Sequence, residues 1–238
     1  MATKGNLLYE GKAKQIYLTD HPDQVIIHFK DTATAFDGKK KENIEDKGLL
    51  NNAISNILFN ELSKRGVNSH LIEVLNEREI LATKINIIPL EVVVRNVVAG
   101  SLAKRTGLSE GTEIEGGIIE FYYKNDDLGD PLFNMDHIKL LKLSTEQDVE
   151  TLTQLGHTIN KHLKEIFLSI GLILVDFKLE FGHFGEVILL GDEISPDTCR
   201  LWDVETKKVL DKDRFRKDMG GVTDAYREVY NRLKAIEG

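Results

Sequence analysis

Residues 175–182 constrain the fold of this chain more than any other segment. They read VDFKLEFG, so charged and apolar side chains alternate along the segment. A period of two belongs to a β-strand whose two faces meet different surroundings. We therefore expect one charged face and one buried apolar face. The charged face holds Asp176, Lys178 and Glu180, and the apolar face holds Phe177, Leu179 and Phe181.

The next apolar segment, 186–190, is predicted to pair with this strand as a hairpin. Residues 182–185 form the short turn, so Glu180 and Asp192 are expected to meet just beyond the paired residues. Two carboxylates, with water and phosphate oxygens in the other positions, suit Mg²⁺. A solvated ladder of Asp, Lys and Glu charges is the alternative, and the residues of the strand alone favour it.

The wider pattern predicts the α+β class, because strand-rich and helix-rich parts of the chain are segregated. We place the seam near residues 85–89. The predicted lobes are an N-terminal, antiparallel, β-rich lobe of residues 1–86 and a larger mixed α/β lobe of residues 87–238. Strands are expected at 7–9, 15–18, 25–29, 71–75, 80–85 and 90–94, and helices at 51–65, 100–107, 144–170 and 226–233.

Local signals add three expectations about loops and helix starts. The polar stretch 30–52 has few apolar residues, so we expect a long functional or mobile loop there. Ser144 and Gln147 have the spacing of a capping box for the long helix. Ser101, after Gly100, is expected to cap a short helix that Gly107 ends.

Composition excludes several classes of function. The formal net charge of −8 argues against a nucleic-acid duplex or an anionic membrane as the main partner, since both need a positive field. Cys199 is the only cysteine, which excludes an intrachain disulfide, and we expect it to be an ordinary small residue rather than a nucleophile. The seven histidines lack zinc-ligand spacing. Without a signal peptide or a membrane-spanning run, the protein is expected to be cytoplasmic.

Two segments carry residues suited to binding anions. Lys12 and Lys14 flank Ala13 in a turn between predicted strands, where they can cover a nucleotide, although an exposed turn with solvated lysines is the simpler reading of that segment alone. Arg95, at the end of an apolar strand, and Ser101 together predict a phosphate monoester site. An ordinary helix cap beside a surface arginine explains Arg95 and Ser101 about equally well. Arg200 is a candidate second anion clamp.

Together these segments resemble the phosphoribosylaminoimidazole-succinocarboxamide synthase (SAICAR synthetase) family. The resemblance runs from LYEGKAK at 8–14 to KDRFR at 212–216, and its most specific parts are residues 89–101 and 175–182. It also covers Asp37. The residue before it is Phe36, at a position where many family members carry Gly. The implied fold has two lobes with an ATP cleft between them.

The family's reaction is an ATP-dependent ligation in de novo purine biosynthesis. The carboxylate of a carboxyaminoimidazole ribonucleotide (CAIR) takes the γ-phosphoryl group of ATP, and the amine of L-aspartate then displaces phosphate to form an amide. ADP and phosphate leave. The resemblance implies ATP, Mg²⁺, CAIR and L-aspartate as ligands, with no nucleic acid or membrane partner, and a homo-oligomer, which we expect to be a dimer.

The resemblance also implies roles for individual residues. Those expected at the reacting groups or closing the site are Lys178, Asp176, Lys124 and Asp130. Those expected to bind ATP are Lys12, Ala13, Lys14, Lys84, Ile87 and Glu91. Those expected to bind CAIR or to border the aspartate pocket are Arg95, Ser101, Arg200, Asp197 and Arg216. The expected metal ligands are Glu180 and Asp192.

Two rival functions are open on the sequence. A small-molecule kinase with a similar nucleotide cleft would form ADP without needing aspartate. A nucleotide-sensing module would bind without turnover, but sensing does not require Glu180, Lys178 and Asp192 to gather around one hairpin.

Overall fold

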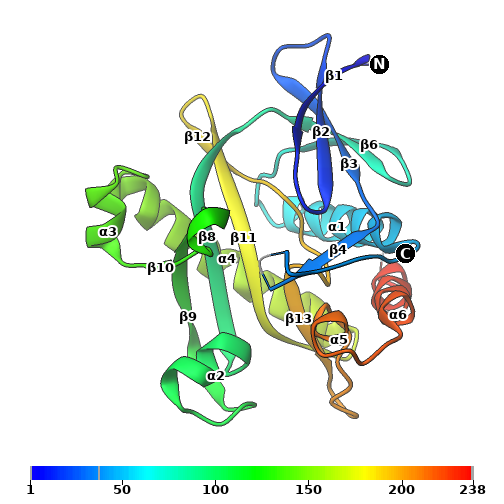
Figure 1. The fold of residues 1–238 in the computed structure, drawn as a ribbon, viewed down its shortest axis with the longest axis vertical. Helices are drawn as coiled ribbons and strands as arrows, with labels where there is room; N and C mark the ends of the chain where they lie inside the picture. Colours follow the sequence, from blue (N-terminus) through cyan, green and yellow to red (C-terminus); the bar gives the residue numbers. More distant parts are fainter. Residues whose placement is uncertain (1, 37, 237–238) are drawn as a thin grey trace.

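Two antiparallel sheets form the framework of the protein (Figure 1). The computed structural model describes residues 2–36 and 38–236; Asp37 lies outside the described residues. Sheets and helices are arranged as an α+β fold, which confirms the predicted class. None of the helices in these two ranges is both long and apolar enough to cross a membrane.

The N-terminal sheet has the order β1-β2-β3-β7-β6. It confirms the predicted strands and the predicted hairpin that turns at residues 77–78. Its inner face packs Val25, Ile27, Phe29 and Ile80 into a small core of its own. The strands are β1 (Lys4–Glu10), β2 (Lys14–Thr19), β3 (Gln24–Phe29), β7 (Glu79–Thr83) and β6 (Leu71–Asn76).

The polar stretch 30–52 is not the long loop that the sequence predicted. It folds as a hairpin of β4 (Thr32–Ala35) and β5 (Lys40–Asn43), followed by α1 (Lys47–Ser63). The first turns of α1 are buried even though they are polar: Lys47 and Asn51 are each only 1% exposed. The start of α1 could not be predicted from apolar periodicity, because its buried residues make ionic and hydrogen-bonding contacts instead of apolar ones.

The second sheet carries the segment 175–182 at its centre, in β11. Its order is β10-β9-β8-β11-β12, and β13 also pairs with β11. Asp176 is opposite both Arg95 of β8 and Arg200 of β13, so these two strands lie on opposite edges of β11. The strands are β8 (Asn86–Val97), β9 (Glu113–Tyr123), β10 (Leu132–Phe133), β11 (Leu172–Phe184), β12 (Val187–Leu190) and β13 (Cys199–Asp203).

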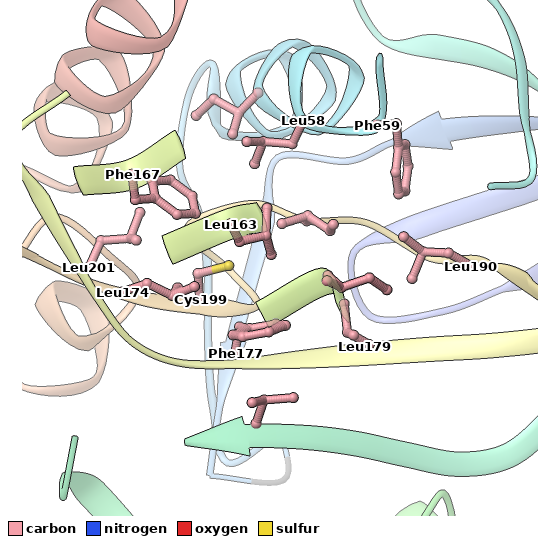
Figure 2. Close-up of a cluster of buried hydrophobic side chains, with 14 of the residues drawn as sticks. Leu58, Phe59, Leu163, Phe167, Leu174, Phe177, Leu179, Leu190, Cys199 and Leu201 are labelled. Atoms are coloured by element: carbon pink, nitrogen blue, oxygen red, sulfur yellow. The ribbon is translucent and has the colours of Figure 1, made fainter. Parts of the chain in front are cut away.

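The main core lies between this second sheet and the helices α1 and α4 (Glu146–Ser169) (Figure 2). The predicted apolar face of β11 is confirmed: Phe177, Leu179 and Phe181 are each at most 1% exposed. Leu58 of α1 and Leu163 of α4 are fully buried in the same core. The face of β11 that carries Asp176, Lys178 and Glu180 is left for other contacts.

Cys199 lies within this core beside Leu163 and Leu174, as Figure 2 shows. Only 3% of it is exposed, and burial raises the pKa of its thiol. A neutral, buried thiol is a poor nucleophile. The geometry therefore supports the prediction of an ordinary core residue.

Two predicted helix caps are wrong by one or two residues. For α4 the capping box uses Thr145 and Asp148 in place of Ser144 and Gln147. The Asp148 carboxylate reaches back to accept from the Thr145 N–H at 3.2 Å, which a residue at 147 is not placed to do. The short helix α2 (Gly100–Thr106) is capped by Ala99, so Ser101 lies inside its first turn, free to contact Arg95.

The remaining helices are η1 (Asp126–Leu128), α3 (Met135–Leu140), α5 (Asp213–Arg216) and α6 (Val222–Lys234). Among them, α6 packs across α1, α3 lies at β10 and α5 lies against β4 (Figure 1). The sheets change at the predicted seam, whereas α1 packs on the main core together with α4. The division into lobes at residues 86 and 87 stays a prediction.

The buried imidazole of His70 predicts a pH-dependent stability. His70 is 3% exposed; burial, with repulsion from Lys14, lowers its pKa from 6.5 to about 4. The unfolded chain binds a proton below pH 6.5 that the folded protein does not bind until pH 4. This contribution to stability is therefore complete above pH 6.5 and is lost as the pH falls toward 4, by about 2 kcal/mol at pH 5.

Urea unfolding at pH 7.5 and pH 5 measures this effect. His70→Gln removes the titrating group, so its loss of stability between the two pH values should be about 2 kcal/mol smaller than that of the wild type. His21→Gln, in an exposed turn, is the control and should follow the wild type. An unchanged pH difference in His70→Gln would show that His70 does not titrate in this way.

Candidate active site

A pocket of about 330 Å³ opens over the charged face of β11. One wall is the β4–β5 hairpin with Lys12 from the first turn, and another is formed by α5 and the residue before it. The floor comes from three neighbouring strands, β8, β11 and β13. Its charged lining residues are Lys12, Glu91, Arg95, Asp130, Asp176, Lys178, Asp197, Arg200, Lys212 and Arg216.

Asp176 joins two arginines at one end of this floor. Its Oδ2 accepts from Arg95 Nη1 at 2.9 Å and from Arg200 Nη1 at 2.8 Å. All three are side by side because the strand registers place them in one row. Burial by itself would lower the pKa of Arg95 and Arg200, but their carboxylate partners outweigh it and raise both. We call this group the arginine row (Arg95, Asp176 and Arg200).

Further groups hold each arginine in place. Arg95 donates to Glu120 Oε2 at 2.7 Å, to the Tyr122 hydroxyl at 3.1 Å and to Ser101 Oγ at 3.2 Å. Arg200 Nε donates to Asp213 Oδ2 at 3.1 Å. Burial opposes ionisation of Asp213, but Arg200 and Arg216 lower its pKa to about 2. The guanidinium groups are thus fixed before any ligand arrives.

Lys178 and Glu180 form a second charged group two and four residues along β11. Lys178 Nζ is 2.7 Å from Glu91 Oε1 and 2.8 Å from Glu180 Oε1. Lys124 Nζ, from the segment after β9, is also 2.8 Å from Glu180 Oε1. Burial disfavours both lysine cations, yet Glu180 outweighs it and raises their pKa values.

Asp192 lies beside this group, directly after β12. The Gly191 N–H donates to the Glu180 carbonyl at 2.8 Å, which brings the next residue alongside Glu180. Lys14 contacts Asp192 Oδ1 and also reaches Glu193 Oε1 at 2.8 Å. Burial alone would raise the pKa of Asp192, but Lys14 and Lys178 outweigh burial and lower this pKa below its ordinary value. Its backbone is left-handed, with φ of 54°, a conformation that Asp tolerates better than most residues. The two carboxylates are therefore part of one cluster of acids and lysines.

The predicted nucleotide-binding residues are placed less uniformly. Lys12 lines the pocket and donates to Asp126 at 2.7 Å, whereas Lys14 is half-buried and paired with Asp192 and Glu193. Ala13 is held by its carbonyl, which accepts from the Lys30 N–H at 2.8 Å. Lys84 and Ile87 are exposed, near the end of β8 far from Arg95, and neither lines this pocket.

The loop after β9 supplies two predicted site residues, Lys124 at its start and Asp130 near its end. Lys124 pairs with Glu180, as described, and Asp130 lines the pocket. Asp130 Oδ1 accepts from the Asn125 N–H at 2.8 Å, which closes the loop on itself. This internal contact fixes the loop beside the floor.

Asp197 and Arg216 line the far wall, next to residues that the sequence did not indicate. Asp197 is held by Lys47 at 2.5 Å and by the Tyr226 hydroxyl at 2.6 Å, while Lys212 is 3.5 Å away. Glu193, which binds Lys14, is another missed residue. The one sequence signal for Glu193 was its position next to Asp192. Lys47 and Tyr226 gave none, because they come from distant helices.

Glu180 and Asp192 are the residues best suited to hold a divalent cation. Both are carboxylates, the donors that Mg²⁺ prefers. Glu180 Oε1 takes both lysines, while its Oε2 accepts no hydrogen bond from the described part of the chain. Across residues 2–36 and 38–236, no three His, Cys, Asp or Glu side chains form a metal cluster. A cation here would need other ligands, such as water and phosphate oxygens.

Comparisons with known proteins agree on one family. The family model described as SAICAR synthetase matches residues 7–233. The chain is 56% identical over 234 residues to the phosphoribosylaminoimidazole-succinocarboxamide synthase of Bacillus subtilis (strain 168), covering 98% of this chain and 97% of that one. It matches the crystal structure of the Ehrlichia chaffeensis synthase with a TM-score of 0.94 and 50% identity, covering 97% and 99% of the two chains. A SAICAR synthetase solved in complex with ADP matches with a TM-score of 0.92 and 48% identity, covering 95% and 97%.

Gly100 predicts a measurable coupling between α2 and the arginine row. A Cβ on Gly100 would lie 2.7 Å from Arg200 Nη2, and the residue has φ of 53°. Gly100→Ala should force the Arg200 guanidinium from its partners. Gly107→Ala has the same kind of backbone strain, with φ of 74° but open space around its Cβ. Gly100→Ala should therefore lose about 1–3 kcal/mol more unfolding free energy than Gly107→Ala. Urea denaturation of both variants measures the difference; equal losses would show that Arg200 moves without cost.

Proposed function

The chain belongs to the SAICAR synthetase family, and from that premise we propose that it joins L-aspartate to the carboxylate of CAIR in an ATP-dependent ligation of purine biosynthesis. The CAIR carboxylate attacks the γ-phosphorus of ATP, and ADP leaves. The aspartate amine then attacks the resulting acyl carbon, loses a proton and expels phosphate. The products are the amide SAICAR, ADP and phosphate.

The observation that carries the proposal is the order of charged groups along β11. The arginine row lies at one end, and Lys178, Glu180 and Asp192 lie at the other. Four residues of extended strand span about 13 Å. That length suits a ribonucleotide whose phosphate lies on the arginines and whose base reaches Lys178. The reacting carboxylate then meets the phosphoryl donor at the acidic end.

We assign the CAIR phosphate to Arg95, Ser101 and Arg200. Two guanidinium groups offer the fork of N–H donors that phosphate oxygens accept. Asp176 holds both forks toward one point, so the donors need little reorganisation when the ligand binds. Asp176 is thereby a positioning residue for the phosphate.

We assign the ATP phosphates to the turn with Lys12, Ala13 and Lys14, and place the rest of the nucleotide toward Lys84, Ile87 and Glu91. A relative in this family binds ADP, which supports a nucleotide site in this fold. Glu180 and Asp192 would hold Mg²⁺, which when bound offsets the charge of the transferring phosphoryl group. Lys178 neutralises the CAIR carboxylate at the moment it approaches another anion, while Lys124 and Asp130 border the opening.

We assign the binding of L-aspartate, the amine donor, to the wall with Asp197 and Arg216.

A small-molecule kinase remains the alternative, but membership of a ligase family does not favour it. A cytoplasmic location and a homodimer stay predictions. So does the division of labour in which residues 1–86 cover the nucleotide and residues 87–238 hold the substrate and the metal.

Release of ADP distinguishes the ligase from the kinase. With CAIR, ATP and Mg²⁺ present, we expect sustained ADP release only when L-aspartate is added, because the acyl phosphate needs an amine to complete the cycle. A coupled ADP assay measures the rate, and mass spectrometry identifies the product. Equal rates without aspartate, with phosphorylated ribonucleotide as the product, would favour the kinase.

Glu180→Gln tests the proposed metal ligand. The amide keeps the shape but loses the charge, so the Mg²⁺ concentration for half-maximal turnover should rise about 10- to 100-fold. Glu186→Gln, in the exposed turn of the same hairpin, is the matched control and should leave the Mg²⁺ requirement unchanged. A Glu180→Gln enzyme with the wild-type Mg²⁺ response would remove Glu180 from the metal site.

A further inference from the structure

A buried charge cluster lies behind the far wall of the pocket. We call it the lysine cluster, and it consists of Lys47, Asp197, Lys212 and Tyr226. Asp197 Oδ2 is 2.5 Å from Lys47 Nζ and 3.5 Å from Lys212 Nζ, and Oδ1 accepts from the Tyr226 hydroxyl at 2.6 Å. The exposed fractions of the Lys47, Asp197 and Lys212 side chains are 1%, 4% and 15%.

The lysine cluster contains more positive than negative charge. Asp197 is ionised: burial opposes its charge, but Lys212 and Lys47 outweigh burial and keep its pKa far below the ordinary value. Tyr226 is neutral, since burial beside Asp197 raises its pKa. Two lysines therefore share one carboxylate. A buried charge without a counter-ion is costly, so the cluster favours an additional anion.

The neighbouring charged groups have other partners. Glu193 is within 2.8 Å of Lys14 and accepts from Ser195 Oγ at 2.5 Å. Arg216 donates to Asp213 at 2.6 Å. From a distance, Arg216 lowers the pKa of Lys212 and Glu193 raises it. Neither is within salt-bridge distance of Lys212 in the described part of the chain.

Lys212 is the member of the cluster that an anion can reach. It lines the pocket, whereas Lys47, the first residue of α1, is only 1% exposed and does not line it. Its Nζ donates to Asp197 Oδ2 at 3.5 Å, the outer limit of a hydrogen bond, while Lys47 Nζ forms an ion pair with the same oxygen at 2.5 Å. Lys212 therefore keeps donors available toward the pocket.

Backbone hydrogen bonds place Lys212 beside the segment that leads into β13. The Lys212 N–H donates to the Pro196 carbonyl at 3.0 Å, and the Thr198 carbonyl accepts from the Lys178 N–H at 2.9 Å. Lys212 thus adjoins the part of the chain that faces Lys178. Arg200, which faces Asp176, lies further along β13. The next residue, Asp213, accepts from Arg200 Nε at 3.1 Å, so Lys212 lies between the arginine row and the residues that face Lys178.

We propose that Lys212 binds a carboxylate of the incoming amino acid, and that buried Lys47 positions Lys212 by occupying Asp197. A dicarboxylic amino acid has one more anionic group than its neutral relatives, so a site with excess positive charge selects for it. This inference rests on the proposed ligation and names the residues that recognise its amine donor. If Lys47 did not hold Asp197, Lys212 would close on that carboxylate and lose its free donors.

The experiment compares Lys212→Met, Lys212→Arg and Lys47→Met with a surface control, Lys208→Met. Loss of a charge-assisted contact worth about 1.5–3 kcal/mol should raise the aspartate KM of Lys212→Met by about 10- to 150-fold. Its KM values for CAIR and ATP should stay within about twofold of wild type, since phosphate and nucleotide contacts are untouched. Lys212→Arg should recover part of the loss, and Lys47→Met should shift the aspartate KM in the same direction.

A second readout separates recognition from a general structural effect. Wild type should prefer aspartate over asparagine, which lacks the side-chain charge, and over aspartate α-amide, which lacks the main-chain charge. In Lys212→Met the preference over one of these two analogues should shrink about tenfold or more, because the contact that discriminates is gone. Melting temperatures identify any variant that fails to fold. Should Lys47→Met be one of them, the Lys212 pair still decides the question.

The outcomes also separate this inference from the function it rests on. A wild-type enzyme without aspartate-dependent ADP release would overturn the proposed function itself. An active wild type, with a folded Lys212→Met that keeps its aspartate KM and its analogue preference, would overturn only the role of Lys212. An equal rise in the CAIR KM would place Lys212 at the ribonucleotide, which also contradicts the proposal. Among the described residues, the Lys208 side chain pairs with Glu228 on the surface, so Lys208→Met should match wild type.

Discussion

The shared carboxylate of Asp176 is the contact on which the rest of the site depends. It lies on the central strand of the large sheet and holds one arginine from each neighbouring strand, at 2.9 Å and 2.8 Å. Because a sheet fixes the spacing of its strands, the two guanidinium groups are held at a fixed separation. Lys178 and Glu180 follow it two and four residues further along β11.

The pocket combines a rigid floor with walls from distant parts of the chain. Its floor is made of strands that are anchored from below by a core between the sheet and two helices. Its walls come from the first turn, the β4–β5 hairpin and the segment around α5. This arrangement lets a chain with a net charge of −8 gather lysines and arginines at one place, where each is balanced by carboxylates. An anionic ligand then competes with, or adds to, internal ion pairs that already orient the cations.

Prediction from sequence worked where the signal was local. The alternation in 175–182 gave the two faces of β11, and turn residues gave both hairpins. It did not find the hairpin and helix start in 30–52, because the residues buried there are polar and their partners are far away in sequence. The cap of α4 was wrong by one residue, since Ser144 and Thr145 both offer a hydroxyl at the helix start. The cap of α2 was wrong by two residues, because that helix begins after Ala99 without a side-chain cap.

The sequence by itself determined the strand that carries the chemistry, the sign of each charge on it and the family to which those residues belong. Only the tertiary structure decided how the charges are paired: Asp176 with two arginines, Lys14 with two acids, and one carboxylate with two lysines. The physical reason is the range of the forces involved. Side-chain period and turn preference act over a few residues, whereas an ion pair such as Lys47–Asp197 joins residues 150 positions apart and exists only once the chain has folded.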